Sequence, residues 1–167
     1  GGWITPGDLW IAPDGAAHIL WTERAIDERL RERFFPDAKQ SHALQYAVVR
    51  QGKVEQRQAL VLAEENGSRE IPGRGRFHVT PDHRLWVVFY VSGRDAAGQA
   101  LSENRLMELR PGGKAGPAVR VPLKQPFSEF FTATVRGGSP PSHTIHLLGP
   151  PSDSPITVRY ARISVGC

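Results

Sequence analysis

Arginines interspersed with carboxylates are the side chains of this chain best suited to recognition chemistry. An arginine binds a carboxylate through paired hydrogen bonds, and neighbouring Asp and Glu side chains accept hydrogen bonds from hydroxyl groups. Such a set suits a polyhydroxylated or acidic ligand, but it is equally typical of solvated loops. The candidate ligand-binding residues are Glu23, Arg24, His42, Arg74, Arg76, Arg94, Asn104, Arg105 and Glu129.

No spacing in the sequence assigns a catalytic residue. The chain has no Gly-x-Ser-x-Gly elbow, phosphate-binding loop or dinucleotide fingerprint. A polysaccharide lyase would need a His and Tyr pair with an arginine, for which His42, Tyr46 and Arg76 are the candidates. A glycoside hydrolase would need two carboxylates at a set separation. The catalytic residues therefore stay unassigned.

Metal and cofactor binding are not expected either. His143 and His146 are three residues apart in a strand-like run, so their side chains point to opposite faces. No Cys and His spacing matches a zinc site, and Cys167 is the only cysteine. We therefore expect no metal, no cofactor and a fold that depends on packing instead of disulfide bonds.

Composition excludes some partners. The chain has 21 Lys and Arg residues against 17 Asp and Glu residues, a net charge of +4, and the two signs are mixed along the chain. A nucleic-acid binder usually concentrates its positive charge, so we expect no nucleic-acid partner. No apolar run approaches the length of a membrane helix, so we expect no membrane partner. The first residues, which lack Met, are typical of a cleaved or processed product.

Short strands with tight turns dominate the chain. Residues 8–15 form an apolar run closed by a Pro-Asp-Gly turn, and residues 18–22 follow as its hairpin partner. Two further strands are predicted at 43–50 and 54–63. These four strands predict one antiparallel unit over about residues 7–63.

The same pattern then returns twice. Residues 76–83 repeat the first strand and its Pro-Asp turn, and a second unit is predicted over about 75–123. A third unit over about 128–165 has strands at 130–136, 143–148 and 156–163 but lacks a fourth. Such repeats of four short strands are typical of β-propeller blades, and a β-sandwich is the alternative.

A helical pattern interrupts the first unit. Ile26, Leu30 and Phe34 recur at helical spacing, which predicts a short helical insertion near residues 24–35. It is interpreted as a solvated helix, with a lid or partner-binding arm as the alternative. We therefore expect an all-β single domain over 1–167, a partial β-propeller of about three four-stranded antiparallel blades with this insertion.

The chain resembles the BNR-repeat, sialidase-like class of β-propellers. The resemblance is carried by residues 7–15 with 18–21, by 43–46 with 51–53, by the repeat at 76–91 and by 156–163. It implies a propeller fold and favours a secreted or periplasmic location. No stretch matches the full Asp-box pattern Ser-x-Asp-x-Gly-x-x-Trp, so no catalytic residue carries over and sialidase activity is not implied.

Three blades form an open arc whose exposed sheet edges invite pairing. Either the chain is a fragment of a longer protein, or two copies form a homodimer that closes a six-bladed ring. Residues 2–6 are predicted to supply the missing outer strand of a third blade, either that of their own chain or that of a partner. The candidate residues would then gather on the face formed by the loops that join blades and by the loops between second and third strands.

These features predict a propeller module that binds carbohydrate or another protein. One alternative is a sialidase-like glycoside hydrolase or a polysaccharide lyase whose active site forms only in the closed ring. Another is a structural scaffold for protein–protein contacts.

Overall fold

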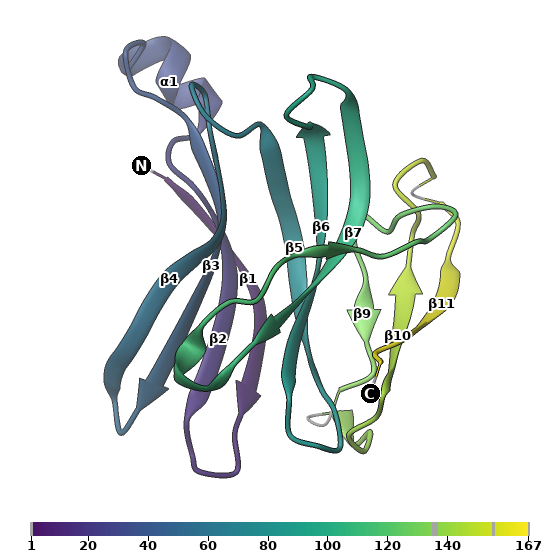
Figure 1. Cartoon of the computed structure of the whole chain (residues 1–167). Helices are drawn as coiled ribbons and strands as arrows, with labels where there is room; N and C mark the ends of the chain where they lie inside the picture. Colours follow the sequence, from purple (N-terminus) through teal and green to yellow (C-terminus); the bar gives the residue numbers. More distant parts are fainter. Residues whose placement is uncertain (1, 135–136, 155, 167) are drawn as a thin grey trace.

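The computed structural model describes residues 2–134, 137–154 and 156–166. These residues form three antiparallel sheets of four, four and three strands, with one short α-helix. Figure 1 shows that the sheets follow one another along the chain and lie side by side. The all-β class, the three successive antiparallel units and the helical insertion are confirmed.

The first sheet is a meander of four strands in chain order. It contains β1 (Trp3–Ile11), β2 (Ala17–Arg24), β3 (Ser41–Arg50) and β4 (Lys53–Glu64). The turn between β1 and β2 is held by Asp14, whose Oδ1 accepts a hydrogen bond from the Ala16 amide at 3.0 Å. Gln51 and Gly52 both adopt positive φ, the backbone of a tight two-residue hairpin between β3 and β4.

Helix α1 (Glu28–Phe34) lies between β2 and β3. Asp27 caps its N-terminus by accepting a hydrogen bond from the Arg29 amide at 3.0 Å. None of the helix residues is buried, as expected for a solvated helix. Gln40 fastens the insertion instead, because its Nε2 donates to the Ile26 carbonyl at 2.7 Å and its Oε1 accepts from the Ile26 amide at 3.2 Å.

The second sheet repeats the meander. Its strands are β5 (Glu70–Val79), β6 (Leu85–Arg94), β7 (Ala100–Leu109) and β8 (Val119–Arg120), and a short 3₁₀ turn, η1 (Pro111–Gly113), lies between β7 and β8.

The third sheet is smaller. It contains β9 (Phe131–Thr132), β10 (Thr144–Gly149) and β11 (Arg159–Ser164), in the order β11-β10-β9. The strand predicted at 130–136 is therefore shorter than expected, and its residues 135–136 lie outside the described residues. Within the described part of the chain this sheet has no fourth strand.

The prediction that residues 2–6 complete the third blade of their own chain needs correction. Residues 3–6 are the first part of β1 and pair with β2, with Trp3 opposite Arg24 and Pro6 opposite Trp21. The sequence suggests that the strand starts after Pro6 and Gly7. Instead, a bulge between Pro6 and Asp8 lets β1 continue back to Trp3. These residues therefore belong to the first sheet and do not complete the third sheet of their own chain.

Two apolar cores hold the sheets together. The first lies between the first and second sheets and includes Leu20, Tyr46 and Phe89. The second lies between the second and third sheets and includes Val88 and Ile145. Strand β6 contributes alternate side chains to both cores, so both faces of the second sheet are covered. This explains the almost continuous apolar sequence of β6.

The first strands of the sheets are joined by polar contacts from β5. Asp8 of β1 accepts a hydrogen bond from the Phe77 amide at 3.0 Å. Arg76 donates to the carbonyl of Gly7 at 2.6 Å and to that of Phe130 at 3.2 Å, and its guanidinium lies over the Phe131 ring at 5.2 Å. One arginine thus ties together β1, β5 and the segment that leads into β9.

Candidate functional site

An open hollow lined by charged and polar side chains lies at the end of the sheets that carries α1, at the top of Figure 1. We call it the upper hollow. It has a volume of about 610 Å³ and lies between α1, the connection from β4 to β5, and the end of β6. Its charged and titratable lining residues are Glu28, His42, Glu64, Glu65, Arg69 and Arg94.

The wall formed by α1 is fixed to the sheet by side-chain contacts. Gln40 donates to Glu28 Oε1 at 2.6 Å, which holds the first turn of α1 over the start of β3. Arg31 forms ion pairs with Glu28, at 3.6 Å, and with Glu65 in the connection from β4 to β5. The helix and the loop therefore form one wall of the upper hollow.

His42 provides a half-buried imidazole at the base of this wall. It lies at the start of β3, opposite Arg24 of β2. Burial lowers the pKa of His42 below its ordinary value, and the positive charge of Arg24 lowers it further, while Glu28 acts in the opposite direction. At neutral pH the ring is therefore uncharged and offers one hydrogen-bond donor and one acceptor.

Two exposed arginines form the opposite wall. The Arg94 amide donates to the Arg69 carbonyl at 3.2 Å, and Arg94 Nη1 donates to the Gly98 carbonyl at 2.8 Å. Gly93 is required beside them, because it has a φ of 106° and a Cβ there would collide with the Arg69 carbonyl. The backbone thus places both arginines in the lining of the upper hollow.

A smaller hollow of about 280 Å³ adjoins His42 and includes Glu23 and Arg24. Glu23 is engaged within the first sheet, since its Oε2 accepts hydrogen bonds from Arg57 at 3.2 Å and from the Trp21 indole at 3.4 Å. Arg24 pairs with Asp27 at 3.6 Å and lies 5.9 Å from the centre of the Trp3 ring. Its Nε is buried without a hydrogen-bond partner in the structure.

The other predicted residues lie elsewhere. Arg74 and Glu129 form an ion pair at 3.7 Å between β5 and the segment before β9, close to Arg76. Asn104 is fully buried, and its amide makes two hydrogen bonds to the backbone of Phe127, at 2.7 and 2.9 Å.

Arg105 is similarly occupied. It makes ion pairs at 2.6 Å with Glu70 of β5 and with Glu103 of its own strand, β7. Of the nine candidates, the structure therefore brings His42 and Arg94 into the upper hollow and Glu23 and Arg24 beside it. Sequence reasoning missed Arg69, Glu28 and Glu64, although they lie in or next to segments rich in charge.

A second groove of about 820 Å³ opens at the opposite end of the first two sheets. Tyr46 and His18 lie on its wall, with the Tyr46 hydroxyl 2.7 Å from His18 Nδ1 and the Trp10 ring 4.8 Å from the His18 ring. Burial raises the pKa of Tyr46 to about 12 and lowers the pKa of His18. A phenol whose pKa is raised is a poor catalytic base, so this pair is suited to packing.

Two carboxylates of this lower groove, Glu108 and Asp14, are engaged by arginines. Glu108 accepts a hydrogen bond from Arg84 at 2.7 Å, and Asp14 accepts one from Arg50 at 2.9 Å. The arginine lowers the pKa of Glu108, and the Ala16 amide, followed by Arg50, lowers that of Asp14. A general acid needs a raised pKa, so neither carboxyl group is suited to protonating a leaving group near neutral pH.

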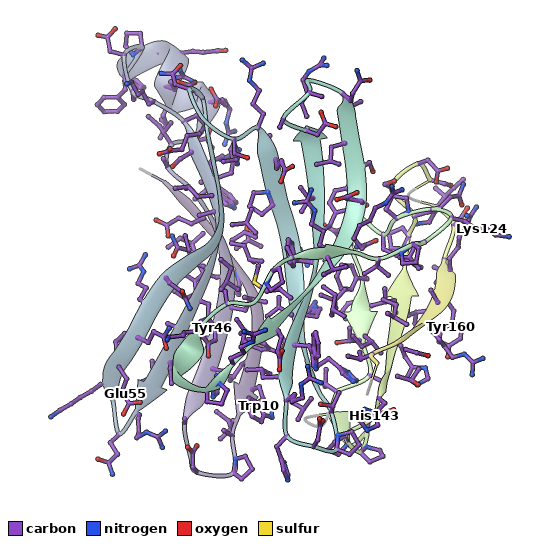
Figure 2. All side chains as sticks on the ribbon, in the orientation of Figure 1. Trp10, Tyr46, Glu55, Lys124, His143 and Tyr160 are labelled. Carbon is purple, nitrogen blue, oxygen red and sulfur yellow. The ribbon has the colours of Figure 1, made fainter. Side chains whose placement is uncertain are left out.

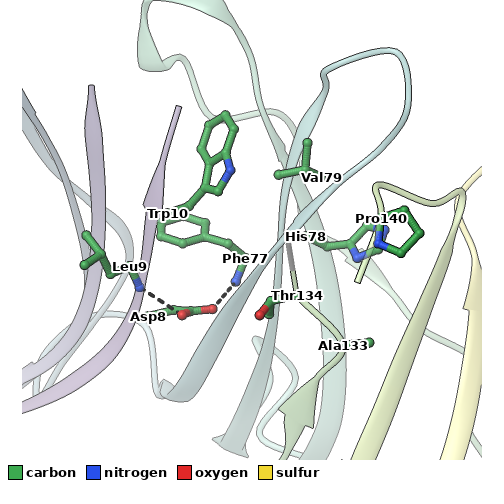
Figure 3. A pocket seen from close by; sticks show the side chains of 9 residues that line it. All are labelled: Asp8, Leu9, Trp10, Phe77, His78, Val79, Ala133, Thr134 and Pro140. Atoms are coloured by element: carbon green, nitrogen blue, oxygen red, sulfur yellow. Dashed lines mark hydrogen bonds between the residues drawn. The ribbon is translucent and has the colours of Figure 1, made fainter. Parts of the chain in front are cut away.

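A third cavity lies between the first strands of the sheets (Figure 3). Its lining includes Asp8, Phe77, His78 and Thr134, and Figure 3 shows the Asp8 carboxylate bonded to the amides of Leu9 and Phe77. The cavity volume of about 20 Å³ suits one water molecule and no larger ligand.

No group of three or more His, Cys, Asp or Glu side chains in residues 2–134, 137–154 and 156–166 is arranged to hold a metal ion. No helix in the same part of the chain is long and apolar enough to cross a membrane.

Comparison with known proteins gives no family for the chain. No protein-family model matches it, no curated protein matches its sequence, and no solved structure matches its fold.

Proposed function

We propose that the chain is a three-blade segment of a β-propeller whose upper hollow binds a carbohydrate that carries a carboxylate. The observation that carries this proposal is the convergence of Arg69, Arg94 and His42 on one open hollow. Arginine binds a carboxylate in a bidentate fashion, and the neutral imidazole and neighbouring acids bind hydroxyl groups.

The stacking of the sheets supports the propeller part of the proposal. Each sheet is a meander, each packs one face on the next sheet, and contacts from β5 bring the first strands together. A β-sandwich would instead enclose a single core between two sheets. Here two separate cores flank a middle sheet, which favours consecutive blades.

The electrostatics support binding over catalysis. In the lower groove, the pKa values of Asp14, Asp82 and Glu108 are lowered, and the pKa of Tyr46 is raised. These directions oppose the roles of general acid and phenolate base in a hydrolase or a lyase. The upper hollow offers an exposed mixture of charges that suits reversible recognition.

Titration calorimetry with an oligogalacturonate of four sugar units tests this function. The expected result is saturable binding that weakens at least tenfold, equivalent to about 1.4 kcal/mol, in the Arg69→Gln variant. Arg69 is chosen because its exposed guanidinium can be removed without disturbing an apolar core. Binding should also weaken when a neutral oligosaccharide of equal length replaces the acidic one.

Arg120→Gln is the matched control. The Arg120 side chain is also exposed and lies on β8, outside the upper hollow, where it pairs with Glu103 at 3.3 Å. Equal affinities of the Arg69→Gln and Arg120→Gln variants, or no binding by the unmodified protein, would overturn the proposed function.

A further inference from the structure

The outward side of the third sheet repeats the side chains with which the first sheet packs on the second. In the first sheet, Tyr46 of β3 lies opposite Leu20 of β2 and accompanies His18, two residues before Leu20. In the third sheet, Tyr160 of β11 lies opposite Leu148 of β10 and accompanies His146, again two residues before the leucine.

The two His–Tyr pairs also agree in geometry. The hydroxyl of Tyr46 lies 2.7 Å from His18 Nδ1, and that of Tyr160 lies 2.7 Å from His146 Nδ1. The centres of the paired rings are 5.9 Å apart in both sheets. The same set of residues thus occupies the same register positions on the first and third sheets.

The surroundings of the two sets differ. Leu20 and Tyr46 are each 1% exposed because the second sheet covers them. Leu148 is 49% exposed and Tyr160 is 59% exposed, as is neighbouring Phe131 at 68%. Figure 2 shows Tyr160 on the side of the third sheet that faces away from the other sheets. We call Phe131, His146, Leu148 and Tyr160 the third-sheet face.

A matching apolar surface lies on the outward side of the first sheet. There, Leu9 of β1 is paired with Ile19 of β2. The corresponding pair of the second sheet is Phe77 and Val87, and these two residues pack on the first sheet. Ile4, Leu9 and Ile11 are 40–62% exposed. We call Ile4, Leu9, Ile11, Ile19 and Trp21 the first-sheet face.

The first-sheet face contains a hollow at the position that corresponds to the site where Leu20 packs on the second sheet. Leu20 packs beside Gly75 and Val87, since a Cβ added at Gly75 would meet Leu20 Cδ2 at 2.8 Å and Val87 Cγ1 at 3.4 Å. The corresponding hollow of the first sheet has a volume of about 560 Å³ and is lined by Gly7, Ile19 and Trp21. In this hollow, Ile19 occupies the register position that Val87 occupies in the second sheet.

We propose that the occupant of the third-sheet face is the first-sheet face of a second copy of this chain. Leu148 of one copy then fills the hollow beside Ile19 of the other, as Leu20 fills its place beside Val87. Two such contacts, related by two-fold symmetry, close a ring of six sheets. The inference concerns a surface remote from the upper hollow and does not depend on the proposed ligand.

Light scattering of the purified protein tests the pairing. The expected molar mass is twice the 18.4 kDa of the single chain. Leu148→Glu and Ile19→Arg, made separately, should each halve this mass, because each variant places a charge in both contacts of its own dimer. Mixing the two variants should restore the doubled mass, since the mixed dimer has one Glu–Arg contact and one unmodified contact.

The mixing step makes the result specific to a first-sheet to third-sheet contact. If third-sheet faces packed on each other, the Ile19→Arg variant would remain dimeric. Phe34→Glu on α1 is the matched control, since Phe34 is 57% exposed and lies outside both faces, and it should leave the mass doubled. Circular dichroism confirms that each variant is folded.

A folded, unmodified protein that stays at 18.4 kDa at every concentration would overturn the proposal. That result would mean that a sheet from another polypeptide or from a longer form of the chain covers these faces. A dimer that survives both charged substitutions would overturn it as well.

Discussion

Arg76 contacts all three sheets at their junction. It hydrogen-bonds to carbonyls on both sides of β5, and its guanidinium lies over the Phe131 ring. The sequence singled it out as a ligand-binding arginine, whereas its guanidinium is occupied within the fold. A charge that is bonded in this way serves the packing of the sheets and is not free for a ligand.

Arg76→Met should therefore lower the free energy of unfolding by about 2–4 kcal/mol, because two charge-assisted hydrogen bonds are lost while the aliphatic part of the side chain is kept. Urea denaturation followed by tryptophan fluorescence measures the loss. Arg120→Met removes an exposed arginine and should change the stability by less than about 0.5 kcal/mol. Equal effects of the two substitutions would contradict the role given to Arg76.

The environment of His78 makes the free energy of unfolding depend on pH. It is 6% exposed, and its Nε2 donates to the Ser142 carbonyl at 2.6 Å. Burial lowers its pKa below the ordinary value of 6.5, although the bond to Ser142 opposes this shift. Below pH 6.5 the unfolded chain binds a proton that the folded chain resists, so folding stability falls as the pH falls through this range.

The free energy of unfolding should thus be lower at pH 5.5 than at pH 7.5, and the difference should be smaller in the His78→Gln variant. Denaturation curves of both proteins at the two pH values provide the measurement. His18 and His42, whose pKa values are also lowered, retain their share of the effect in the variant. An unchanged pH dependence in His78→Gln would show that this histidine does not titrate as described.

At the scale of elements, the close approach of β2 to β5 depends on Gly75. A methyl group at this position would meet Leu20 and Val87 in the first core. Gly75→Ala should therefore destabilise the protein by about 1–3 kcal/mol through overpacking. Gly166→Ala is the control, because nothing lies within 4 Å of a Cβ added there, and thermal unfolding should not distinguish it from the unmodified protein.

The elements were predictable wherever the signal is local. The hairpin turns at Asp14 and Gln51 follow from turn residues between apolar runs, and α1 follows from the spacing of Ile26, Leu30 and Phe34. The bulge that extends β1 back to Trp3 was not predictable, because it depends on pairing with β2.

The candidate site was predictable only in part, because some of its residues are positioned by contacts between segments that are distant in the sequence. His42 and Arg94 lie at strand ends, which sequence periodicity locates. Glu28 enters the upper hollow because Gln40 and Arg31 fix α1 beside the connection from β4 to β5, and Arg69 does so because its carbonyl accepts a hydrogen bond from the Arg94 amide. Asn104 and Arg105 were proposed as ligands because their type suits that role, whereas their partners come from distant segments.

At the scale of the whole molecule, no described residue covers the outward apolar faces of the first and third sheets, where Leu9 is 40% and Leu148 is 49% exposed. In the second sheet, both apolar faces are buried, because the first sheet covers one face and the third sheet covers the other. The repetition of the His–Tyr pair on the first and third sheets indicates that the third-sheet face is built for the same kind of contact. The proposed assembly of two copies would cover both faces in the same way.

Covalent trapping of that contact tests the claim most directly. Leu148→Cys and Ile19→Cys are combined with Cys167→Ser, and the protein is treated with a short bismaleimide. The two new thiols lie on outward sides of sheets that the second sheet separates, so one chain cannot link them to each other. A covalent dimer at twice 18.4 kDa is expected under denaturing conditions, and a product that remains at 18.4 kDa would show that the two faces do not pair.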